Sequence, residues 1–431
     1  DGQLAPEDRL LMAEILASRP EPVSRLKAVA LYEKLSETQR LSLDAELRLG
    51  RLYFSLGQWR KCREQMINAI ARYPKEAQVR VRYLGMLLER GGPSELDEAV
   101  RQVRRLAKLA PNELQTREIA ARVAMKQGKE KEAYGDVRGM LPRRLNGITP
   151  EQLPLVLRVA GLLDDMGAAA QAEPLFKLVA ERGDLDSKAA YAKFVGASVD
   201  SERGLAMLGE LRDEMEPLRV IQRALLILRS AREEDAPEAP KLAATIEKWL
   251  TSALREDPEL TPLIMQRAEL MDLKGEYAKA AEIYGELLEV DDLSTVNRAI
   301  ILNNFAYLQA LTNSSSEAIA EARRCVDEAV EILGPGTDIL DTRAVVAIAD
   351  KRYDEAIADL KLSVIDRPTP TKYFHKAIAH LMAGQTEEAM AAWKEATDRG
   401  LSEDDISDLE IEQFRSVKEQ LEGLGMQSAS L

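Results

Sequence analysis

Apolar residues along this chain recur at intervals of three and four positions, and short polar segments separate one apolar stretch from the next. Spacing of this kind places the apolar side chains on one face of an α-helix. No run alternates Val, Ile, Thr or aromatic residues with polar ones between turn pairs, as a half-buried strand would. The pattern therefore predicts an all-α fold.

The helical pattern repeats with a period of about 34 residues, and small residues mark it best. Ala99 lies 34 positions before Ala133, and Ala356 lies 33 before Ala389. We expect these positions to be small because two helices of one repeat cross there. Glycines follow the first helix of a pair and prolines the second: Gly57, Gly128, Gly167, Gly275, Gly384, Pro74, Pro111, Pro258 and Pro368.

The period predicts about eleven helix pairs. Their expected starts lie near residues 9, 43, 77, 114, 153, 187, 219, 261, 297, 337 and 370. The pair near 187 lacks most small-residue markers and is predicted from helical periodicity alone. A last helix over about 407–422 is expected to cap the final pair, because the end of a repeat array needs a polar outer face.

These residues resemble the tetratricopeptide repeat (TPR) superfamily, most strongly at 43–76, 114–140, 153–182 and 261–401. Segments 301–307, 339–343 and 370–375 are similar to long bacterial TPR proteins, some of which are associated with envelope assembly or exopolysaccharide export. The resemblance implies an α-solenoid with a right-handed superhelix. Its first helices would line a concave groove that binds a protein or peptide. The Lys and Asn set of a chaperone-type carboxylate clamp is missing from the matching positions, so such a clamp is not expected.

Charge divides the chain unevenly. Residues 1–150 contain 28 Lys and Arg against 20 Asp and Glu, whereas the remainder contains 31 against 53, so net charges of +8 and −22 make up the total of −14. The period has its longest break at 141–154, where the sign changes. We therefore predict an N-terminal basic domain over 1–147, a partly degenerate central one over 148–258, and an acidic C-terminal one over 259–431.

Residue patterns of catalysis are missing from the sequence. It has no phosphate-binding loop, dinucleotide fingerprint, nucleophile elbow or zinc-protease motif. His375 and His380 are five positions apart, on different helical faces, with no Cys or acidic cluster to complete a site, so packing or exposure is expected of both. Cys62 and Cys325 are expected to be structural. We predict no enzyme activity, no cofactor and no metal site.

Other properties stay open. No apolar run approaches the roughly 20 residues of a membrane span. The compartment is left open between cytoplasm, periplasm and the exterior, as is the oligomeric state. The chain begins without Met and is compatible with a mature form or a fragment.

Basic residues are the candidate binding site. Arg48, Arg51, Arg82, Arg122 and Lys126 map to groove-facing positions of the first helices, with Phe54 and Met125 as apolar neighbours. They form either a solvated helix face or a charged groove for an acidic segment of a partner protein. The predicted function is a protein-interaction scaffold. The alternatives are the docking arm of a larger enzyme or of an envelope or export assembly, and, less favoured, a nucleic-acid-binding repeat, because aromatic residues are not interleaved with the arginines.

Overall fold

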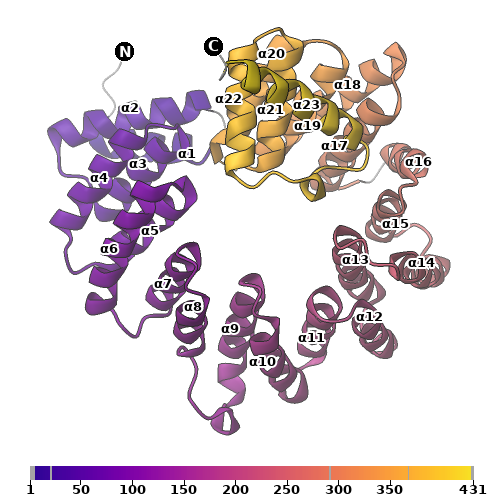
Figure 1. The fold of residues 1–431 in the computed structure, drawn as a ribbon, viewed down its shortest axis with the longest axis horizontal. Coiled ribbons are helices and arrows are strands. Elements are labelled where there is room, and N and C mark those ends of the chain that lie inside the picture. The colour runs from indigo at the N-terminus through magenta and orange to yellow at the C-terminus, as the bar shows by residue number, and fades with distance from the viewer. Residues whose placement is uncertain (1–4, 20–21, 291–292, 367, 429–431) are drawn as a thin grey trace. The chain divides into compact units, whose positions relative to one another are not determined.

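The computed structural model describes residues 5–19, 22–290, 293–366 and 368–428. Across these residues the chain is helical and contains no strand (Figure 1). The α-helices are α1 Pro6–Ala17, α2 Pro22–Thr38, α3 Leu43–Ser55, α4 Trp59–Arg72, α5 Ala77–Arg90, α6 Pro93–Leu109, α7 Leu114–Lys126, α8 Glu130–Arg138, α9 Leu153–Asp165, α10 Ala169–Arg182, α11 Leu185–Ser198, α12 Ser201–Glu210, α13 Pro217–Glu233, α14 Ala239–Glu256, α15 Thr261–Leu273, α16 Tyr277–Leu288, α17 Thr295–Thr312, α18 Ser316–Leu333, α19 Thr337–Ala349, α20 Tyr353–Asp366, α21 Pro370–Met382, α22 Thr386–Asp398 and α23 Ile411–Ser428.

Consecutive helices pack on one another as pairs, for example α5 on α6, α9 on α10, α19 on α20 and α21 on α22. Helices begin at the expected positions 43, 77, 114, 153, 261, 337 and 370, while α11, α13 and α17 begin two residues early and α1 three. The predicted all-α fold of TPR-type helix pairs is therefore confirmed. The number of repeats and the hand of the superhelix stay predictions.

The last helix differs from its expected range of 407–422. It begins at Ile411, because residues 407–410 form a turn in which Glu410 is buried against other helices. Phe414, Val417 and Leu421 of α23 are buried in one cluster with Phe374 and Trp393. The helix therefore covers the apolar end of the α21–α22 pair, as a capping helix should.

The chain divides into two compact units. One comprises residues 32–54 and 58–249, and the other comprises 55–57, 250–431 and the described residues of 1–31. Within the first unit one apolar core continues from α7 through α10 to α11 and includes Leu141 and Ile148 of the connection between α8 and α9. The predicted domain limits at 147 and 258 stay predictions.

Close helix contacts explain the small residues. A Cβ atom on Gly50 of α3 would lie 2.6 Å from the sulfur of Met66 on α4. Ala280, Ala356 and Ala389 are fully buried, as their shared position predicts, and Ala356 packs with Ala344 and other residues of α19 to α21. A larger side chain at such a position would overpack the crossing.

Several turns inside the pairs contain one residue in the left-handed region of φ. Gly57 and Gly275 have φ angles of 69° and 74°, a region that other residues enter at a cost. In the α19–α20 turn Lys351 takes the same place with φ of 59°. Its geometry shows that the left-handed turn can form without a glycine.

Candidate binding cleft

The first helices of four successive pairs form a cleft of about 520 Å³ in the unit of residues 32–54 and 58–249. Arg51 of α3, Arg82 of α5, Arg122 of α7 and Arg158 of α9 line it with guanidinium groups. The remaining lining residues are Gln78, Val81, Gly85, Met86, Glu89, Gln115, Glu118 and Ile119. Four arginines face two glutamates, so the cleft is basic. Val81, Met86 and Ile119 give it an apolar floor.

Part of this charge is already neutralised. Arg51 lies 2.9 Å from Glu89, and Glu118 pairs with both Arg122 and Arg158. Arg82 is exposed and, among the described residues, makes no ion pair. Exposed pairs of this kind contribute only about 0–1 kcal/mol, so the glutamates can give way to carboxylates of a ligand. In the cleft, a ligand carboxylate can therefore replace the glutamates that pair with Arg51, Arg122 and Arg158. Arg82 has no such glutamate among the described residues.

The sequence-predicted residues fall into two groups. Arg51, Arg82 and Arg122 line the cleft together, whereas Arg48 and Lys126 are exposed on α3 and α7 outside its lining. Of the five predicted basic residues, three therefore lie in the cleft and two face solvent outside it.

Neither apolar neighbour lines the cleft. Phe54 lies edge-on to Trp59 with ring centroids 6.1 Å apart, and the guanidinium of Arg51 lies 5.2 Å from its ring centre. Met125 packs against the core of α7 to α11. Phe54 therefore positions Arg51, and Met125 stabilises the wall.

Two lining features were missed from the sequence. Arg158 follows Arg122 by 36 positions, a spacing close to the period that would have identified it. Gly85 lies in the middle of α5, where a Cβ atom would meet nothing within 4 Å. Its missing side chain keeps the floor of the cleft open.

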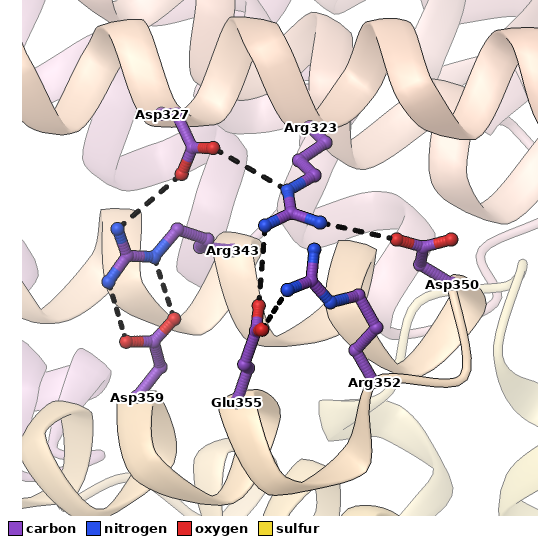
Figure 2. A network of polar contacts seen from close by, with 7 residues as sticks. All are labelled: Arg323, Asp327, Arg343, Asp350, Arg352, Glu355 and Asp359. Atoms are coloured by element: carbon purple, nitrogen blue, oxygen red, sulfur yellow. Dashed lines mark hydrogen bonds and ion pairs between the residues drawn. The ribbon is translucent and has the colours of Figure 1, made fainter.

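A second, smaller cleft of about 290 Å³ lies between α18, α19 and α20. Figure 2 shows its ion-pair network. Arg343 makes two hydrogen bonds of 2.7 Å to Asp359, and its other nitrogen is 3.5 Å from Asp327. Arg323 contacts Asp327, Asp350 and Glu355 at 3.5–3.7 Å, and Arg352 also pairs with Glu355. Three arginines are matched by four acids, so this cleft offers no unpaired cation and joins three helices.

Cysteine chemistry is suppressed by burial. Burial raises the pKa of Cys62 to about 12 and that of Cys325 to about 11, so both stay protonated thiols. The described residues contain no group of His, Cys, Asp and Glu that could hold a metal ion, and none of their helices has the length and apolar character of a bilayer span.

The histidines are both buried, which fits the expected packing role, but the expectation that no acidic residues accompany them is wrong for His375. The Nδ1 atom of His380 donates a 2.7 Å hydrogen bond to the side-chain oxygen of Gln385, which fits a packing role. His375, however, has acidic partners: Asp341 at 2.9 Å and Glu410 at 3.2 Å. They escaped the sequence analysis because they lie 34 positions before and 35 after the histidine.

Comparisons with known proteins return helical-repeat structures. No protein-family model matches the chain, and no curated protein matches it in sequence. A tetratricopeptide repeat protein of Parabacteroides merdae is 16% identical over 62% of this chain and 98% of its own, with a TM-score of 0.42. A thermophilic TPR protein of Thermus thermophilus is 17% identical over 46% and 98%, with a TM-score of 0.35. Yeast Tom70 is 14% identical over 96% of both chains, with a TM-score of 0.36. Similarities this low carry no argument about partners, so the fold assignment rests on the helix pairs themselves.

Proposed function

We propose that this protein is an interaction scaffold that docks an acidic segment of a partner protein in the basic cleft of α3, α5, α7 and α9. The observation that carries the proposal is the convergence of Arg51, Arg82, Arg122 and Arg158 on one cleft. They come from four separate repeats, so their meeting is a property of the assembled array.

Arginine suits this ligand class. The planar guanidinium pairs with a carboxylate through two parallel hydrogen bonds, and a groove lined by one sign of charge concentrates ligands of the other sign. Gln78 and Gln115 add amide groups that hydrogen-bond to a peptide backbone, and Val81, Met86 and Ile119 add apolar contact. An extended acidic segment with occasional apolar residues matches this lining.

Nucleic acid fits the cleft less well. None of the lining residues is aromatic, so bases would find no stacking surface, and the chain as a whole carries −14. A role as docking arm of a larger enzyme or assembly is compatible with the same cleft, since it differs in what lies beyond this chain.

The test uses a fluorescent Asp- and Glu-rich peptide and a double charge reversal, Arg51→Glu with Arg122→Glu. Two reversals each lose a weak ion pair and add repulsion, so we expect Kd to rise by about five- to thirtyfold. Fluorescence anisotropy measures the change. Gly85→Met, which fills the floor without altering charge, should also weaken binding.

The matched control is Arg48→Glu with Lys126→Glu, which makes the same charge change on the same two helices outside the cleft. It should leave Kd within about twofold, because exposed charges beyond the contact are screened by salt. Equal weakening by both double variants would show that the peptide responds to net charge and that the cleft is not its site.

A further inference from the structure

Three side chains in the unit that contains residues 250–431 occupy one repeated position. Tyr307 of α17, Asp341 of α19 and His375 of α21 follow one another at 34-residue intervals, as do Asp338 and Lys372 one turn earlier. The Lys372 ammonium lies 2.7 Å from Asp338, and the Nδ1 atom of His375 lies 2.9 Å from Asp341. The first helices of the last repeats thus present a polar ladder at one repeated position, which we define as Tyr307, Asp341 and His375.

The ladder holds a carboxylate that comes from outside the repeats. Glu410, in the turn before α23, is only 2% exposed. The Tyr307 hydroxyl donates a 2.6 Å hydrogen bond to one of its oxygens, and Nε2 of His375 lies 3.2 Å from the other. Two donors from two repeats therefore bind one carboxylate, as a receptor binds an acidic ligand.

Electrostatics favours the charged form of this pair. Burial would lower the pKa of His375, but Asp341 and Glu410 outweigh burial and raise it well above its usual value. Burial would raise the pKa of Glu410, but the imidazolium and the Tyr307 hydroxyl lower it. The histidine is then a cation that can donate from both N–H groups, and the site selects an anionic ligand.

The segment around Glu410 is bound like a short peptide. The Tyr277 hydroxyl donates to Asp408 at 3.1 Å, and the Thr371 hydroxyl donates to the backbone oxygen of Asp405 at 3.2 Å. Ile406 is buried among the aromatic residues of the last pair. Residues 405–410 therefore contact the repeats through an apolar side chain, acidic side chains and a backbone oxygen.

The internal ligand is imperfect. Nε2 of His375 is buried and makes no aligned hydrogen bond, although Glu410 lies within ion-pair distance. A carboxylate approaching along the N–H direction would gain that bond. Moreover, α23 is held by Phe414, Val417 and Leu421. The Glu410 backbone oxygen accepts a hydrogen bond from the Phe414 N–H, so exchange requires only the Glu410 side chain to leave the ladder while the cap stays in place.

We propose that the ladder of Tyr307, Asp341 and His375 is a second binding site for an acidic peptide segment of a partner protein, filled in this structure by the chain's own Glu410. A partner glutamate takes the place of Glu410 between the tyrosine and the imidazolium. This site is separate from the basic cleft and does not depend on the function proposed for it.

The test is exchange in the full chain. A synthetic peptide with the sequence of residues 402–411 is added to the Glu410→Gln variant, and hydrogen–deuterium exchange is followed by mass spectrometry. Removing the internal charge weakens the competitor by one charged hydrogen bond, so the peptide should bind about tenfold more tightly than to the unchanged chain. Protection should appear in α17, α19 and α21.

The matched control is Glu412→Gln, which removes an exposed carboxylate two positions farther on and should leave peptide binding as in the unchanged chain. Protection in α3, α5 and α7 would report on the basic cleft instead, so failure of either site is recognised separately. Equal binding by the two variants, or no protection in α17 to α21, would overturn the proposal.

A second measurement asks whether the site is specific for carboxylates. The Glu410→Ala variant leaves space beside Tyr307 and His375, and its melting temperature is compared in propionate and in chloride at equal ionic strength. Propionate that fills the space should raise the melting temperature of Glu410→Ala by about 2 °C, because it binds the folded state and not the unfolded chain. The double variant with His375→Gln should lose this gain, and a Glu410→Ala chain that gains nothing would contradict the assignment.

Discussion

At the scale of single residues, the charge of His375 links the C-terminal ladder to pH. The pKa of His375 is raised above 6.5, the value it regains on unfolding, so its stabilising contribution is complete below pH 6.5 and is lost as the pH rises through the raised value. The pKa of Glu410 is lowered from 4.5, so its contribution is present above pH 4.5 and is lost as the pH falls through the lowered value. Both act fully between these limits.

We therefore expect the amides of α21 to be most protected between pH 4.5 and 6.5 and to lose protection as the pH rises further. Hydrogen exchange corrected for intrinsic rates measures this. The groups facing His375 are Asp341 of α19, Glu410 before α23 and, beyond Glu410, Tyr307 of α17. Loss of the imidazolium leaves two carboxylates close together without their cation.

The variant His375→Gln should flatten this alkaline decline, because the amide does not titrate. His380→Gln is the control: His380 is equally buried but is bonded to an amide, so its replacement should leave the profile of α21 unchanged. An alkaline decline that persists in His375→Gln would assign it to another group.

At the scale of helices, the degenerate pair α11–α12 crosses glycine on glycine. A Cβ atom on Gly204 of α12 would lie 2.2 Å from the backbone of Gly196 on α11. At this crossing the smallest residue stands on both helices, where other pairs have alanine or a larger residue on one of them. The crossing is closer than a side chain allows, so the missing markers reflect tighter packing.

We expect Gly204→Ala to lower the free energy of unfolding by about 1–3 kcal/mol, because backbone must move to admit the methyl group. Urea unfolding followed by circular dichroism measures it. Gly161→Ala on α9 is the control: a Cβ atom there meets nothing within 4 Å, so helix propensity should give a gain of about 0.5–1 kcal/mol. Similar effects of both substitutions would refute the close crossing.

The helices were predictable because each follows a local rule of period, turn and cap. Their starts agree within three residues, including α11, which had periodicity alone. What escaped prediction depends on residues that the fold brings together. Three cleft arginines followed from the register, whereas Arg158 was overlooked on the fourth helix and Glu410 lies outside the period altogether. The repeat period relates Tyr307, Asp341 and His375 to one another, but it cannot identify Glu410, which comes from outside the repeats.

At the scale of the whole molecule, the net charge of the chain is negative, whereas the charge of the proposed binding cleft is positive. The chain carries −14, yet the proposed acidic ligand docks in a cleft with four arginines and two glutamates. Long-range repulsion from the net charge opposes the ligand, and the local field of the four cleft arginines attracts it. Salt screens exposed charges over about 8 Å at physiological ionic strength, so the local field decides the encounter there.

The last prediction concerns rates. Above physiological ionic strength the association rate constant of the acidic peptide should fall with added salt, while its dissociation rate constant changes little, because screened charges act on the encounter more than on the formed contact. Stopped-flow fluorescence separates the two. In the Arg51→Glu, Arg122→Glu variant the association rate should be lower and depend less steeply on salt, whereas the Arg48→Glu, Lys126→Glu variant should keep most of the slope. A salt effect carried by dissociation in the unchanged chain would mean that the arginines act as buried contacts within the complex and that steering by the cleft is absent.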